Sequence, residues 1–254
     1  MKTILSAGEN RRIARAMLDY QMLNHNDRVL VAVSGGIDSL VLAWLLHTWR
    51  KKTPIDYQVQ AVYVDMQPLG QRASQISQRL AHLGLSCISL PTDQPLSIDP
   101  AEDPSGICYQ CARNRRRQLF AYAQQEGYNK IALGHHRDDI VETFFINLTC
   151  SGNISTMRPK QELFSGLLSL IRPLAYLDKE DIRAIGKRLQ LEPVASACPL
   201  SEQTRRMDMR QLLQHIYDEI PGSREHIFAA LGNVRSDYLL LQKKSAKESH
   251  AHNP

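Results

Sequence analysis

The stretch Val29–Ser39, which reads Val-Leu-Val-Ala-Val-Ser-Gly-Gly-Ile-Asp-Ser, decides the fold of this chain. Its first five residues are apolar and rich in β-branched valine, which predicts a strand buried on both faces of a sheet. From Ser39 onward the apolar residues recur at helical spacing. A strand, a glycine turn and a helix form a cradle for an anion, because glycines let the backbone approach closely and a helix N-terminus attracts negative charge.

The spacing within this turn indicates which anion it binds. It is neither the Gly-x-x-x-x-Gly-Lys-Ser/Thr of a Walker loop nor the Gly-x-Gly-x-x-Gly of a dinucleotide fold. It reads Ser-Gly-Gly-x-Asp-Ser and resembles the PP-loop of enzymes that cleave ATP between its α- and β-phosphates. A glycine turn without function is the alternative for an isolated Gly-Gly pair. By the resemblance, ATP is bound by Ser34, Gly35, Gly36, Asp38 and Ser39.

The composition is that of an ordinary globular protein, with 254 residues, 43% of them hydrophobic and 22% charged. The N-terminal stretch has only a few apolar residues and is too short for a signal-peptide core, and no later run is long enough to span a bilayer. A cytoplasmic protein is therefore expected. In a reducing compartment the five cysteines are not expected to form a disulfide framework. A Cys-x-x-Cys pair there calls for a metal or redox explanation.

Strand and helix patterns alternate along most of the chain, which predicts an α/β fold with a mostly parallel, doubly wound sheet. Further strands are expected at 57–64, 86–90, 130–133 and 167–171, and helices at 9–24, 71–83, 111–126, 140–148 and 178–189. A loop is expected at 151–166 and a last helix at 227–241. The predicted domains are an α/β domain over 1–195, a C-terminal helical appendage over 196–243 and a polar tail over 244–254.

Polar residues follow several predicted strands, at the edge of the sheet where ligands bind in such folds. Val64 and Asp65 end one strand and are candidate adenine contacts, with a turn or a helix cap as the alternative for Asp65. Gly134 and His135 end another and are candidates for the nucleotide site. The acids that follow, Asp138-Asp139, either bind Mg²⁺ near the phosphates or cap the next helix.

Three cysteines are candidate metal ligands. Cys108 and Cys111 form a Cys-x-x-Cys pair, expected at a loop-to-helix junction where the helix N-terminus lowers the pKa of the thiols. Cys198 is expected at the same edge of the sheet. Three thiolates can hold a 4Fe-4S cluster or supply three ligands of a zinc site, and a redox dithiol or unrelated thiols are the alternatives. Cys87 and Cys150 are interpreted as small buried hydrophobic residues.

Arginines cluster at 11–15, 113–117 and 205–206, which favours a phosphate-rich partner. Arg113, Arg116 and Arg117 are candidate RNA contacts, because this run begins two residues after Cys111. A solvated helix face is the alternative for four arginines on one helix.

The order of the motifs resembles that of the tRNA 2-thiocytidine synthetases and, more broadly, the iron–sulfur PP-loop tRNA thiolases. The resemblance spans nearly the whole chain and includes Met157-x-Pro159-Lys160 and Arg172-Pro173-Leu174-Ala175-Tyr176. It implies that Cys108, Cys111 and Cys198 are the cluster ligands, and that the catalytic residues near the phosphates are Asp38, Arg115, Asp138 and Asp139. Ile37 stands where these synthetases usually have Lys, and Ser201 where they have a second, non-ligating Cys.

The resemblance implies an ATP-dependent tRNA sulfurtransferase that uses ATP, Mg²⁺ and a 4Fe-4S cluster. ATP would adenylate the C2 oxygen of a cytidine in the anticodon loop, and sulfur delivered by the cluster would displace AMP. The expected partners are tRNA, a cysteine desulfurase or other sulfide donor, and a second copy of the chain in a homodimer; no membrane is expected. Two alternatives stay open: an adenylating ligase of tRNA-lysidine or amidotransferase type with a structural zinc, and a non-enzymatic cluster-bearing RNA-binding or redox-sensing protein.

Overall fold

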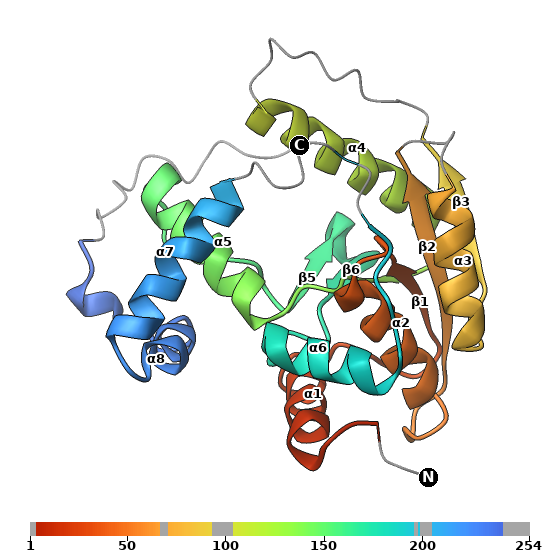
Figure 1. Ribbon diagram of the computed structural model, residues 1–254, viewed down its shortest axis with the longest axis horizontal. Coiled ribbons are helices and arrows are strands. Elements are labelled where there is room, and N and C mark those ends of the chain that lie inside the picture. The colour runs from red at the N-terminus through yellow and green to blue at the C-terminus, as the bar shows by residue number, and fades with distance from the viewer. Residues whose placement is uncertain (1–3, 67–70, 93–103, 196–197, 199–204, 241–254) are drawn as a thin grey trace. The chain divides into compact units, whose positions relative to one another are not determined.

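A computed structural model of the chain describes residues 4–66, 71–92, 104–195, 198 and 205–240 (Figure 1). The strands are β1 (Asp27–Ala32), β2 (Tyr57–Asp65), β3 (Cys87–Pro91), β4 (Lys130–Ala132), β5 (Lys160–Leu163) and β6 (Leu168–Ile171). The α-helices are α1 (Ala7–Asp19), α2 (Ile37–Trp49), α3 (Arg72–His82), α4 (Pro104–Gln125), α5 (Arg137–Ser151), α6 (Lys179–Arg188), α7 (Arg205–Glu219) and α8 (Ser223–Ala230). None of the helices in the described residues is both long and apolar enough to cross a bilayer.

The strands form one six-stranded sheet in the order β3-β2-β1-β4-β6-β5. All neighbours pair in parallel except β5, which runs antiparallel to β6. The chain builds the sheet from β1 outward to β3 and then returns to the other side of β1 with β4. The carboxyl ends of β1 and β4 therefore flank the point where the strand order reverses, which is where ligands bind in open α/β sheets.

Helices cover both faces of the sheet, as the doubly wound prediction requires. Along β1 the side chains alternate: Val29 and Val31 join one core with residues of α1, α2, α3 and α6, whereas Leu30 joins a second core with residues of α4. Figure 1 shows α4 on the opposite side of the sheet from α1, α2 and α6. Burial of β1 on both faces explains its unbroken apolar sequence.

The chain forms two compact units, Met1–Leu213 and Gln214–Pro254. The first holds the sheet and the beginning of α7. In the second, the turn between α7 and α8 contains Gly222 with a φ of +79°, and the buried Ser223 hydroxyl donates to the Ile216 carbonyl at 3.3 Å. The domain division expected at residue 195 stays a prediction.

Several predicted element bounds are wrong. The first helix ends at Asp19 instead of residue 24, and the loop expected at 151–166 contains β5. The helix that was expected to follow Cys111 begins earlier, at Pro104, and the helix expected at 227–241 ends at Ala230.

The interpretation of Cys87 and Cys150 as small buried residues also needs correction, because Cys87 is only half-buried and Cys150 is exposed at the end of α5.

Candidate active site

The glycine loop between β1 and α2 is shaped by its own hydrogen bonds. Gly35 has a φ of +86°, which glycine adopts without steric cost, and a Cβ on it would lie 3.0 Å from Cδ1 of Ile76. The Ser39 hydroxyl accepts the Ser34 N–H at 3.1 Å and donates to the Gly36 carbonyl at 2.8 Å. Gly36 is the N-cap of α2. The predicted ATP-binding residues thus lie in one closed turn at a helix N-terminus, a geometry suited to phosphate. They are Ser34, Gly35, Gly36, Asp38 and Ser39.

The end of β4 lies against the start of α2. Val31 of β1 pairs with Ala132 of β4 in parallel, so the segments that follow the two strands begin side by side. A Cβ on Gly134 would lie 3.1 Å from both the Asp38 carbonyl carbon and the Ser39 backbone nitrogen. The structure therefore brings Gly134, and with it the adjoining residue His135, next to the loop, where the atoms nearest to Gly134 belong to the backbone of Asp38 and Ser39.

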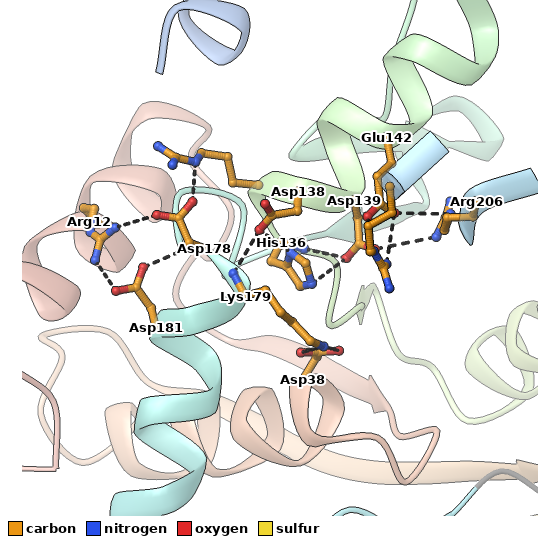
Figure 2. A network of polar contacts seen from close by, with 12 residues as sticks. Arg12, Asp38, His136, Asp138, Asp139, Glu142, Asp178, Lys179, Asp181 and Arg206 are labelled. Carbon is orange, nitrogen blue, oxygen red and sulfur yellow. Dashed lines mark hydrogen bonds and ion pairs between the residues drawn. The ribbon is translucent and has the colours of Figure 1, made fainter. Parts of the chain in front are cut away.

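His136, Asp138 and Asp139 at the start of α5, called here the His-Asp-Asp segment, form a polar network (Figure 2). The His136 backbone N–H donates to the Asp139 carboxylate at 3.0 Å, and the imidazole nitrogens of His136 lie 3.3 Å from Asp138 and from Asp139. Asp139 thus caps α5, in a capping box with His136, which is the second of the two roles expected for this acid. Burial lowers the pKa of His136, but its contacts with Asp138, Asp139 and Asp38 outweigh burial and leave the pKa above its usual value.

The pKa of the neighbouring His135 is shifted in the opposite direction, downward. The guanidinium of buried Arg172 donates from Nε to Nδ1 of His135 at 3.1 Å. Although His135 keeps some exposed surface, desolvation, the largest cause, acts together with the charge of Arg172 and lowers the pKa of His135 to about 4 against the opposing charge of Asp139. A neutral imidazole that accepts at Nδ1 carries its proton on Nε2, so His135 offers a hydrogen-bond donor near the loop at neutral pH.

A lysine from α6 completes this part of the site. Lys179 Nζ lies 2.6 and 2.7 Å from the two carboxylate oxygens of Asp38, and its backbone N–H donates to Asp138 at 2.9 Å (Figure 2). Asp178 is the N-cap of α6, and its N–H donates to Asp181 at 2.9 Å. Sequence reasoning missed Lys179, because the ion pair joins residues 141 positions apart and no local pattern marks it.

A second ion-pair group, also missed from the sequence, connects α5 with α7. Glu142 is only 2% exposed, and its carboxylate accepts from Arg210 Nε at 2.7 Å and Nη2 at 3.3 Å. Arg206 lies 3.6 Å from Asp139. A buried carboxylate needs such partners. Arg206 is therefore engaged with carboxylates in the structure, although its cluster with Arg205 was interpreted as favouring a phosphate-rich partner.

The proposed adenine contacts lie at the end of β2. Val64 is buried in the core beneath α4, and Asp65 is 4% exposed. The Tyr63 hydroxyl donates to the Asp65 carboxylate at 3.3 Å, and the Asp65 carbonyl accepts the Thr92 N–H at 2.9 Å. Contact of Val64 and Asp65 with adenine stays a prediction.

The Cys-x-x-Cys pair lies well inside α4, where Cys108 and Cys111 are one helical turn apart and half-buried. The expected lowering of thiol pKa is wrong for Cys111: burial raises its pKa, Arg115 lowers it in part, and the charges of Cys198 and Cys108 raise it further. Because Cys111 interacts with both other cysteines, the three predicted ligands share one neighbourhood. No three His, Cys, Asp or Glu side chains in the described ranges are placed to hold a metal ion as they stand.

The arginines of α4 follow the cysteine pair on the same helix. Arg113, Arg116 and Arg117 are all exposed, and the Arg116 side chain donates to the carbonyl of Ala112 on its own helix at 3.3 Å. Arg115 is exposed as well, and its positive charge acts to lower the pKa of both Cys111 and Tyr63. Arg115 is therefore within electrostatic range of both Cys111 and Tyr63 of β2.

Comparison with known proteins assigns the family. The family model described as "PP-loop domain" matches residues 8–216. A tRNA-cytidine(32) 2-sulfurtransferase of Geotalea uraniireducens is 36% identical over 232 residues, which cover 90% of this chain and 92% of the relative. The protein of the same name from Xylella fastidiosa is 35% identical over 235 residues, 91% of this chain and 78% of the relative.

Among solved structures, the U34-tRNA thiolase NcsA from Methanococcus maripaludis with its 4Fe-4S cluster matches with a TM-score of 0.70. The match covers 88% of this chain and 77% of that chain at 21% identity, so it shows a common fold. The fold, the glycine loop and the sequence relatives agree. The chain therefore belongs to the PP-loop family and, within it, to the family of the tRNA-cytidine(32) 2-sulfurtransferases.

Proposed function

We propose that this chain is an ATP-dependent tRNA sulfurtransferase that replaces the C2 oxygen of cytidine 32 with sulfur. The observation that carries the proposal is the close approach of Gly134 to the backbone of Asp38 and Ser39, which unites the glycine loop with the His-Asp-Asp segment at the reversal point of the sheet. The named relatives, at 35–36% identity over about nine tenths of the chain, support the substrate.

In the proposed reaction the cytidine oxygen attacks the α-phosphorus of ATP, and pyrophosphate leaves. A sulfur nucleophile then attacks C2, and the C–O bond breaks to release AMP with the former cytidine oxygen. The loop N–H groups and the N-terminus of α2 bind the phosphates. Asp38, Asp138 and Asp139 supply carboxylate oxygens that would suit Mg²⁺, and the ion would balance phosphate charge. Neutral His135 would donate a hydrogen bond without adding charge.

The cysteines fit a 4Fe-4S cluster by their chemistry: three thiols in one neighbourhood, with Cys111 interacting with both Cys108 and Cys198. A cluster held by these three cysteines would have one iron without a protein ligand, and a sulfur anion could bind there. Since burial raises the pKa of Cys111, binding must release its proton. The thiolase NcsA from M. maripaludis, which shares the fold, carries a 4Fe-4S cluster. A zinc site remains the alternative for the same three ligands.

Exposed arginines on α4 are proposed to hold the tRNA. Arg113, Arg116 and Arg117 lie on the helix that carries Cys108 and Cys111, so phosphates bound by them would place RNA near the cysteines. A cysteine desulfurase or another sulfide donor is the proposed sulfur source. A homodimer remains a prediction.

The proposal is tested by mass spectrometry of nucleosides in tRNA from a deletion strain. We expect 2-thiocytidine to disappear and to return when the wild-type chain is supplied. Unchanged 2-thiocytidine would refute the proposal. Iron and sulfide analysis of anaerobically purified protein separates a cluster from a structural zinc, and release of AMP separates an enzyme from a non-catalytic RNA-binding protein.

A further inference from the structure

The glycine loop has no positively charged side chain of its own. Between Ser34 and Ser39 the only ionisable residue is the acid Asp38. Ile37 is directed elsewhere: a Cβ on Gly186 of α6 would lie 2.5 Å from Ile37 Cδ1, so Ile37 packs closely against that helix. The polyphosphate of ATP carries several negative charges, so a cation from another part of the chain is needed beside this loop.

Lys179 is placed to supply that charge. It is the first residue of α6, and its ammonium lies 2.6 Å and 2.7 Å from the two oxygens of Asp38. Its backbone N–H is fixed to Asp138 at 2.9 Å, so the main chain is held while the side chain can move. Both Lys179 and Asp38 keep about a quarter of their side-chain surface exposed, at 27% and 26%, and are accessible to a ligand.

A static tether between α2 and α6 is the competing explanation. The two helices already share an apolar contact through Ile37 and Gly186, and Ile182 and Ile185 of α6 lie in the same core as α2. A partly exposed ion pair adds little to such packing. The Lys179–Asp38 contact is therefore not needed to hold the helices together.

We propose that Lys179 is the phosphate-binding cation of this loop. When Mg²⁺-ATP enters, the ammonium exchanges Asp38 for oxygens of the pyrophosphate portion, and the released Asp38 carboxylate becomes available to the metal. Each charge then has an opposite partner before and after binding. This inference rests on the proposed function, because the chain must bind ATP. It places Lys179 in direct contact with the substrate.

The test is calorimetric titration of Lys179→Met with ATP, pyrophosphate and AMP, each in the presence of Mg²⁺. A charge-assisted hydrogen bond to phosphate predicts that Kd for ATP and for pyrophosphate rises by about 10-fold to 100-fold. Kd for AMP should stay within about 2-fold, because AMP lacks the pyrophosphate that Lys179 binds. Lys187→Met is the matched control, since Lys187 is an exposed residue in the last turn of the same helix.

Two further variants guard against misfolding. Lys179→Arg keeps the charge and should retain most of the ATP affinity, whereas Lys179→Gln should repeat the loss seen with Met. Unchanged affinity of Lys179→Met or Lys179→Gln for both ATP and pyrophosphate would overturn the inference, as would an equal loss for AMP. If the wild-type chain bound neither ATP nor pyrophosphate, the proposed function itself would fail, which is a distinct result.

Discussion

The contact between Gly134 and the glycine loop gives the sharpest test of the site, through the substitution Gly134→Ala. The added methyl group would lie 3.1 Å from the Asp38 carbonyl carbon and the Ser39 nitrogen, and 3.2 Å from the Ser39 Cα. All three are backbone atoms, so no side chain can rotate away. Either the segment that follows β4 or the start of α2 must shift, and both carry residues of the proposed ATP site.

The size of the effect follows from this geometry. Forcing a methyl group into a packed contact costs typically about 1–3 kcal/mol. For a chain of this size each kcal/mol lowers Tm by about 2–4 °C, so we expect a fall of about 2–12 °C. AMP formation should fall further than stability alone explains, because a displaced Ser39 loses its 3.1 Å and 2.8 Å bonds within the loop.

The assay compares thermal unfolding and AMP release for Gly134→Ala and for a control, Gly8→Ala. A Cβ on Gly8 would meet no atom within 4 Å, and Gly8 lies in α1, so alanine there should be neutral or stabilise by up to about 1 kcal/mol. If Gly134→Ala melts at the wild-type temperature and releases AMP at the wild-type rate, the inferred backbone contact does not control the site.

Three other predictions concern the cysteines and arginines. Cys198→Ala should lose iron, visible absorbance and thiolation in anaerobic preparations whereas Ser201→Ala keeps all three; a full cluster in Cys198→Ala would contradict the ligand assignment. Replacing Arg116 and Arg117 by Ala should weaken tRNA binding and flatten its log–log salt dependence by about one unit per lost phosphate contact, and an unchanged slope would identify a solvated face. Burial raises the pKa of Cys87 from 9.0 to about 11, so iodoacetamide at pH 8 should label exposed Cys150 well before Cys87, as peptide mass spectrometry can check. Equal labelling of Cys87 and Cys150 would argue against burial of Cys87. Because the pKa of Cys87 is higher in the folded state, its contribution to the free energy of unfolding is complete below pH 9 and declines as the pH rises toward 11.

The parts of the fold that the sequence predicts well are those with a strong local pattern. The valine-rich strand, the glycine turn and the amphipathic helices depend on periodicity and loop chemistry, and their type is confirmed. β5 was missed because its sequence Lys-Gln-Glu-Leu has neither alternation nor β-branched residues, and it forms only as an edge strand beside β6. The early start of α4 had a local signal that was overlooked, since proline suits a first helical turn.

The parts of the site that sequence reasoning missed are long-range ion pairs. Lys179 meets Asp38, and Glu142 meets Arg210, only because the tertiary fold brings their helices together. Nothing in the sequence around Lys179 or Glu142 marks its partner. The raised pKa of Cys111 was missed for a related reason, because desolvation by tertiary packing outweighs the effects that favour its thiolate.

The central place of β1 in the sheet sets a time at which the loop can reach its final form during synthesis. One edge of β1 pairs with β2, which follows soon after it, but the other edge pairs with Lys130–Ala132, about 100 residues later. At roughly 5–20 residues per second, a growing chain leaves that edge unpaired for about 5–20 s. An unpaired apolar strand edge favours association with other chains. Rare codons between β3 and β4 should therefore lower the soluble yield of this protein more than rare codons placed after β6.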